Sequence, residues 1–134
     1  MKELIVDATE ENFGTVIDFV MEQIKATDCS SKIQKQIEMV VEELYVNIVS
    51  YAYVPQTGSA TIRTDITSDK AEITFIDSGM QYDPLAKPDP DMTIPVWKRQ
   101  VGGLGIFMVK KSMDDVRYEY KDGENILTIV KKLG

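Results

Sequence analysis

The sequence predicts an α+β domain, a two-layer α/β sandwich in which a mixed, mostly antiparallel sheet is covered on one face by helices. Two observations carry this prediction. Apolar residues recur at three- and four-residue spacing in two neighbouring segments, 13–24 and 33–48, which is the period of an amphipathic helix. Later segments alternate apolar and polar residues and are joined by turn residues, which is typical of β-hairpins. The 134 residues are enough for one core, so we expect a single domain over residues 1–134.

The first half of the chain is expected to hold one short strand and two helices. Residues 4–6 are the strand candidate, and polar N-capping residues then open a helix that ends near Asp28. A capping-box pattern begins at Ser31 and opens a longer helix, which runs to about Tyr53 before Pro55 ends it. The apolar stripes of the two helices should pack together.

The second half is expected to hold two hairpins, a long loop and a third helix. The expected strands pair as 60–66 with 71–76, and as 116–120 with 126–130. Between the hairpins, residues 82–101 contain four of the five prolines and have no sustained periodicity. Loops of this length are usually functional or disordered, so we expect a mobile loop here. A glycine-rich segment then opens a helix that ends near Asp115.

Composition excludes several classes of function. The net charge of −7 argues against nonspecific binding to nucleic acid or to an anionic membrane, so we expect neither partner. The chain has no histidine, which excludes a histidine-assisted triad, and a general base here must be a carboxylate. Cys29 is the single cysteine and is interpreted as a half-buried bystander. No signal peptide or membrane span is evident, so a cytoplasmic location is expected.

The second helix carries two polar groups beside its apolar stripe. On a helical wheel Asn47 falls within the buried arc, and Glu43 lies one turn earlier, almost directly above it. One interpretation is a structural polar pair that a neighbouring loop satisfies. The other is that the pair faces a cleft and holds a metal-bound ligand. Mg²⁺ that travels with a nucleotide keeps most of its waters, so Asn47 could be its single protein ligand, and Glu43 could deprotonate an attacking hydroxyl.

Two glycine-containing turns are the other candidate sites. Asp77 ends the strand before Gly79, where a carboxylate can accept a hydrogen bond from an adenine amino group and a glycine allows close approach to the base. Taken alone, an Asp-x-Gly sequence is more often a simple turn. The segment 102–105 reads Gly-Gly-Leu-Gly before a helix, where free N–H groups and the helix dipole suit a phosphate, although such glycines can also simply relieve backbone strain.

In their order and spacing these motifs resemble the nucleotide site of the GHKL ATPase superfamily. The match covers almost the whole chain, and it is most similar to the bacterial anti-sigma factor serine/threonine kinases. The resemblance implies the Bergerat α/β sandwich, with Glu43 as catalytic base, Asn47 as Mg²⁺ ligand and residues 82–101 as the ATP lid. The implied nucleotide-binding residues are Asn47, Asp77, Gly79, Tyr82, Gly102, Gly103, Leu104, Gly105 and Thr128. Asp77 would read adenine, Gly103 and Gly105 would touch the phosphates, and Thr128 would supply a hydroxyl near the nucleotide.

Two positions depart from the family pattern. The family commonly has a small residue after the magnesium asparagine and a histidine four positions after it, whereas this chain has Ile48 and Tyr51. Neither position holds a direct catalytic group, so ATP binding is still expected.

The function that the resemblance implies is an ATP·Mg²⁺-dependent protein serine/threonine kinase. It would phosphorylate an anti-anti-sigma (STAS-type) antagonist protein, bind a sigma factor as an anti-sigma regulatory factor, and form a homodimer. The alternative is a nucleotide-switched ATP-binding interaction module with little or no kinase activity. The presence of Glu43 favours the kinase, because a pure switch has no need of a base. A slow ATPase is the third interpretation.

Overall fold

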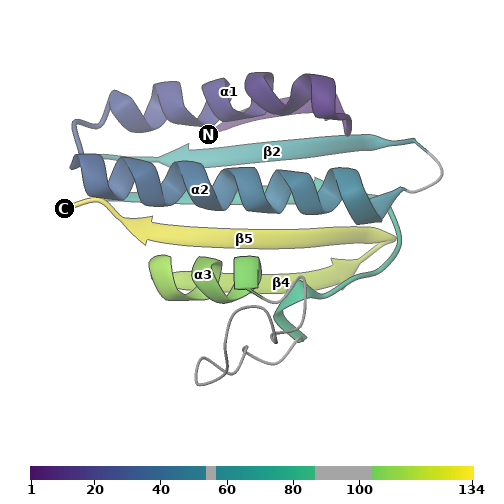
Figure 1. The fold of residues 1–134 in the computed structure, drawn as a ribbon. Coiled ribbons are helices and arrows are strands. Elements are labelled where there is room, and N and C mark those ends of the chain that lie inside the picture. Colours follow the sequence, from purple (N-terminus) through teal and green to yellow (C-terminus); the bar gives the residue numbers. More distant parts are fainter. Residues whose placement is uncertain (54–56, 87–103) are drawn as a thin grey trace.

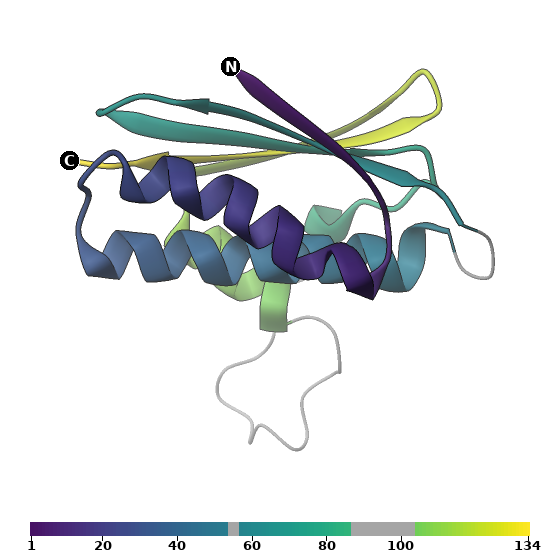
Figure 2. The same ribbon diagram turned by 90° about the horizontal axis from the view of Figure 1, so that it is seen from above.

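The computed structural model describes residues 1–53, 57–86 and 104–134, and these form a helical layer on one face of a five-stranded sheet (Figures 1 and 2). In chain order the elements are β1 (Lys2–Asp7), the 3-10 turn η1 (Glu10–Asn12), α1 (Phe13–Lys25), α2 (Ser31–Asn47), the π-helical turn η2 (Ile48–Ala52), β2 (Ser59–Ile66), β3 (Lys70–Asp77), the 3-10 turn η3 (Pro84–Ala86), α3 (Leu104–Ser112), β4 (Asp115–Lys121) and β5 (Glu124–Lys132). Within these described ranges no helix is long and apolar enough to span a membrane.

The sheet has the order β1-β2-β3-β5-β4, and all of its pairings among the described residues are antiparallel. The expected two-layer sandwich, with a mostly antiparallel sheet covered on one face by helices, is therefore confirmed, and no parallel pair is found among the described residues. The crossover through α3 joins β3 to β4, and these two strands run in the same direction. They are not neighbours, because β5 forms a hairpin with β4 and lies between them, so no parallel ladder arises.

The core lies between α1 and α2 and the inward face of the sheet. Figure 2 shows these two layers from above. The helical stripes are fully buried at Val16, Val20 and Ile24 of α1 and at Ile37, Val40 and Val41 of α2. Alternate residues of the central strands meet them from the sheet, chiefly Ile62, Ile73 and Ile129. The period of the apolar residues thus decided which face each element buries.

Several element ends differ from the sequence prediction. The first helix ends at Lys25 rather than near Asp28, whose positive φ of 61° takes the chain out of the helix. The N-cap of α2 is Ser30 rather than Ser31, because the Ser30 hydroxyl accepts the bond from the Ile33 N–H at 3.3 Å. Residues 87–103, which include most of the expected lid, lie outside the described residues.

Tyr45 joins the long helix to the end of the edge strand. Its ring is fully buried, and its hydroxyl donates to the Thr9 carbonyl at 2.7 Å while accepting from the Thr9 N–H at 3.2 Å. The Asp7 carbonyl lies 3.3 Å from the same oxygen. The ring also packs against Phe13, with 6.3 Å between the ring centroids. One side chain of α2 therefore holds the segment between β1 and α1 in place.

Tyr45→Phe should lower the free energy of unfolding by about 1–3 kcal/mol, because the Thr9 N–H loses its acceptor and the Thr9 carbonyl keeps only the Asn12 N–H, while the ring still fills the core. Urea denaturation measures this loss. Tyr120→Phe is the matched control, since Tyr120 is 41% exposed on β4, and it should change stability little. Equal stability of the two variants would contradict the structural role given to Tyr45.

Candidate functional site

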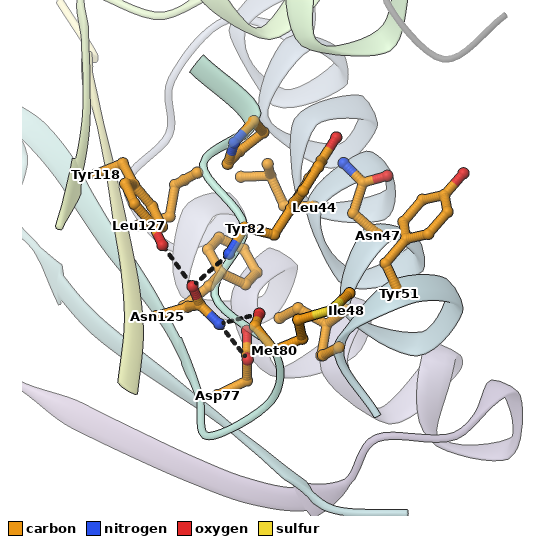
Figure 3. A pocket seen from close by; sticks show the side chains of 13 residues that line it. Leu44, Asn47, Ile48, Tyr51, Asp77, Met80, Tyr82, Tyr118, Asn125 and Leu127 are labelled. Atoms are coloured by element: carbon orange, nitrogen blue, oxygen red, sulfur yellow. Dashed lines mark hydrogen bonds between the residues drawn. The ribbon is translucent and has the colours of Figure 1, made fainter. Parts of the chain in front are cut away.

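A pocket opens where the end of α2 and the turn η2 face the ends of β3, β4 and β5 (Figure 3). Its walls are mostly aliphatic and aromatic. It is lined by Leu44, Asn47, Ile48, Tyr51, Ala52, Phe75, Asp77, Met80, Tyr82, Pro84, Tyr118, Asn125 and Leu127. Apart from tyrosine hydroxyls, its polar side chains are two amides and one carboxylate. An apolar hollow with a few converging polar groups is the usual form of a small-molecule site.

The carboxylate of Asp77 is the buried polar group of this pocket. Asp77 ends β3 and is 8% exposed. Its Oδ1 accepts from the Gly79 N–H at 3.0 Å and from the Asn125 amide at 2.9 Å. Burial raises the pKa of this carboxyl, and the two donated hydrogen bonds oppose that rise. Both bonds go to one oxygen, so among the described residues Oδ2 has no hydrogen-bond donor and remains available as an acceptor for a ligand.

Asn125 is a pocket residue that the sequence reasoning missed. It lies opposite Asp77 in the β3–β5 register, and its side chain is 7% exposed. Its Nδ2 donates to Asp77 and to the Met80 carbonyl, both at 2.9 Å, while its Oδ1 accepts from the Tyr82 N–H at 3.1 Å and from the Tyr118 hydroxyl (Figure 3). The available signal was an asparagine inside a strand, where this residue type is depleted.

The turn after β3 packs directly on the π-helical turn η2. The Met80 N–H donates to the Ala52 carbonyl at 2.9 Å. A Cβ added at Gly79 would lie 2.2 Å from the same carbonyl oxygen, so the position has no room for a side chain. The sequence predicted a regular helix to Tyr53, but the structure changes to a π-helix after Asn47, and π-turns are frequent at functional sites.

Glu43 and Gly105, which belong to two motifs far apart in the sequence, are brought together. A Cβ at Gly105 would lie 2.0 Å from Glu43 Oε1, so the first turn of α3 rests against this carboxylate. Glu43 is half-buried, and its position near a helix N-terminus is favourable for a negative charge. Asn47 is also half-buried and lies one helical turn later, at the pocket. Glu43 is not itself among the residues that line the pocket.

The remaining predicted residues are placed as follows. Tyr82 lies at the pocket, and its ring packs on Tyr51 with 6.0 Å between centroids. Leu104 is the first residue of α3, whereas Gly102 and Gly103 lie outside the described residues.

Thr128 is not at the pocket, so its expected place near a nucleotide is corrected. Strand β5 turns Asn125, Leu127 and Ile129 toward the helices and therefore turns Thr128 to the opposite face of the sheet. There its hydroxyl lies 3.2 Å from that of Thr74. A one-residue error along a strand moves a side chain to the other face.

Fold and pocket together define the class of histidine-kinase-like ATPase domains, in which helices cover one face of an antiparallel sheet. The family model of the histidine kinase-like ATPase domain matches residues 6–131. The chain therefore belongs to the histidine kinase-like ATPase domain family.

Curated relatives and solved structures agree with this assignment. The serine-protein kinase RsbW of Bacillus cereus is 29% identical over 97 residues, which are 69% of this chain and 61% of that protein. RsbW of Bacillus mycoides is 28% identical over 97 residues, which again are 69% of this chain and 61% of that protein. The match thus spans about three fifths of the length of these relatives.

Two solved structures share the fold. The catalytic domain of histidine kinase ThkA has a TM-score of 0.58 at 14% identity, and the match covers 99% of this chain and 97% of that one. The Acinetobacter baumannii histidine kinase AdeS has a TM-score of 0.52 at 15% identity, covering 100% of this chain and 68% of that one.

Gly79→Ala should lower the free energy of unfolding by about 1–3 kcal/mol, because the new methyl group overlaps the backbone of η2, which cannot move without distorting the pocket. Thermal denaturation measures this effect. Gly14→Ala in α1 is the matched control: its Cβ meets no atom within 4 Å, and alanine favours a helix, so stability should rise slightly. A Gly79→Ala variant as stable as the wild type would show that the turn does not pack on η2 in this way.

Proposed function

We propose that this protein is an ATP·Mg²⁺-dependent protein serine/threonine kinase that acts as an anti-sigma regulatory factor. The observation that carries the proposal is the meeting of Glu43 with Gly105, one helical turn from Asn47 at the pocket. A candidate base, a candidate metal ligand and the start of a candidate phosphate-binding helix are thereby gathered at one side of the Asp77 pocket. Phosphoryl transfer depends mainly on such positioning and on charge stabilisation.

The pocket residues fit an adenine nucleotide. Apolar walls suit the faces of a purine, and Oδ2 of Asp77, which no donor among the described residues engages, suits the exocyclic amino group of adenine. The Asn47 amide at the pocket offers one oxygen to a hard cation. Bound Mg²⁺ would neutralise phosphate charge. Among the described residues no group of three histidine, cysteine or acidic side chains gathers as a metal cluster, and we assign a single ligand, Asn47.

Glu43 is assigned the role of general base. Its carboxylate would accept the proton of the partner's serine or threonine hydroxyl while that oxygen bonds to the γ-phosphorus and the bond to the ADP oxygen breaks. Gly105 lies in the N-terminal turn of α3, and the free backbone N–H groups of a helix start suit a phosphate. We assign phosphate contacts to the segment 102–105 on this ground and treat residues 82–101 as the ATP lid.

The proposed partners follow from the relatives. Proteins named serine-protein kinase RsbW are similar to this chain, which supports a protein substrate with a serine acceptor. We propose an anti-anti-sigma (STAS-type) protein as the substrate and a sigma factor as the second partner. A homodimer is part of the same proposal.

The contact between Glu43 and Gly105 also favours a second function. The Glu43 carboxylate rests against the first turn of α3, where it stabilises a helix N-terminus without any chemistry. In that case the protein is an ATP-binding interaction module whose nucleotide state alone switches partner affinity.

Asp77→Asn should weaken ATP binding by about ten- to a hundredfold, because an amide can place a donor against the adenine amino group and loses the charged acceptor. The substitution should not lower the stability of the ligand-free protein. A carboxyl with a raised pKa contributes stability only at low pH, and this contribution is lost as the pH rises through the folded-state pKa. At neutral pH the ligand-free variant should thus be at least as stable as the wild type. Calorimetry with ATP and thermal denaturation test both parts, and unchanged ATP affinity would count against the pocket.

Glu43→Gln should leave nucleotide affinity within a few-fold but slow phosphoryl transfer by roughly 10²–10⁴, the usual contribution of a positioned base. Asn47→Asp is the contrasting variant, because it changes the charge at the metal and should alter affinity and rate together. Labelled ATP with the antagonist protein measures the transfer. If the wild type transfers no phosphate while nucleotide exchange still switches partner binding, the interaction-module function replaces the kinase.

A further inference from the structure

The amide of Asn125 is completely engaged in hydrogen bonds, and its orientation is unambiguous. The Tyr82 N–H can only donate, so the atom 3.1 Å from it is the amide oxygen. The Met80 carbonyl can only accept, so the atom 2.9 Å from it is the amide nitrogen. With the nitrogen thus assigned, its second hydrogen points at Asp77 Oδ1. The amide cannot flip, because one of its ends must accept a hydrogen bond and the other must donate one.

This orientation decides which oxygen of Asp77 is presented to a ligand. The Gly79 N–H and the Asn125 Nδ2–H both engage Oδ1. The carboxylate is therefore held in one rotation, with Oδ2 directed away from these donors. The same amide connects three elements that line the pocket, since it bonds the end of β3, the turn that includes Met80 and Tyr82, and Tyr118 of β4 (Figure 3).

We propose that Asn125 is the positioning residue that gives the pocket its selectivity for a purine with an exocyclic amino group at the Asp77 position. This inference rests on the proposed nucleotide function. Asn125 acts through Asp77, which itself would accept the hydrogen bond of the base. A guanine nucleotide presents a carbonyl where adenine presents its amino group, and a carboxylate held with Oδ2 forward repels that carbonyl. Once the carboxylate can rotate, the discrimination between adenine and guanine falls.

The first test removes the positioning amide. In Asn125→Ala the affinity ratio between Mg·ADP and Mg·GDP should fall by about tenfold or more, because Gly79 alone cannot hold the carboxylate in one rotation. Thr74→Val is the matched control. It removes the side-chain hydrogen bond to Thr128 in the same β3–β5 pair, but on the face away from the pocket, and it should keep the wild-type ratio. Circular dichroism checks that each variant is folded.

The second test gives a readout that general loss of structure cannot imitate. Asn125→Asp places a second carboxyl at 2.9 Å from Asp77, and two carboxylates this close share one proton. In the shared-proton form an O–H replaces the lost N–H donor, so acid should restore adenine affinity and selectivity. As the pH rises and the proton leaves, affinity should fall by up to about tenfold per pH unit.

The wild type should lack the additional pH dependence that the second carboxyl creates, since its amide does not titrate. The other ionisable groups around the pair are the same in both proteins, so they cancel in the comparison. They are Tyr53 directly after η2, Tyr82 and Asp83 from the turn after β3, Tyr118 and Tyr120 from β4, and Glu124 from β5.

The outcomes separate this inference from the function on which it rests. A wild type that binds Mg·ADP and Mg·GDP equally overturns the adenine pocket itself. A selective wild type with equally selective, folded Asn125→Ala and Asn125→Asp variants overturns the positioning role and leaves the nucleotide function standing. A lowered ratio in Asn125→Ala together with acid recovery in Asn125→Asp supports the proposal.

Discussion

The burial of the Asp77 carboxylate is the constraint on which the rest of the site depends. A carboxylate removed from water needs hydrogen-bond donors, and the fold supplies them from the turn that follows β3 and from the neighbouring strand β5. Because one donor is a side chain on β5, the register of the β3–β5 ladder must place Asn125 opposite Asp77. A shift of one residue would turn the amide to the other face of the sheet. The central strand pair is thus tied to the chemistry of the pocket as well as to the core.

Close backbone packing then closes the pocket from the helical side. The absence of a side chain at Gly79 lets the turn after β3 reach the carbonyl of Ala52, where the π-helical turn ends. Tyr53 strengthens the same contact, since its hydroxyl donates to the Ser59 carbonyl at 2.6 Å and accepts from the Ser78 N–H at 2.7 Å. These contacts hold the end of α2, including Asn47, beside the end of β3, where Asp77 lies. Apolar packing alone would allow the helix to slide by small amounts, whereas these directional bonds do not.

Sequence periodicity predicted the elements well, because the buried face of a helix or strand is a local property. The stripe through Val40 and Leu44 is buried, as the helical wheel indicated, whereas Asn47, which the wheel placed within the buried arc, is half-buried. Predictions that depended on register were less successful. Thr128 lies on the outer face of β5 although its residue type suited a nucleotide site. Asn125 was missed because its role arises only when β3, β4 and the turn at Met80 meet around it.

By itself the sequence determined the layered α+β architecture, the amphipathic faces, the absence of histidine, and the resemblance to a nucleotide-binding family. These follow from composition, from the two periods of secondary structure and from short motifs, which are local along the chain. The tertiary structure alone decided that Glu43 rests against Gly105, that Asn125 holds Asp77, and that Thr128 faces away from the pocket. The physical reason is that strand pairing, with a side-chain period of two, and packing between distant segments select these contacts, and neither is written in any short stretch of sequence.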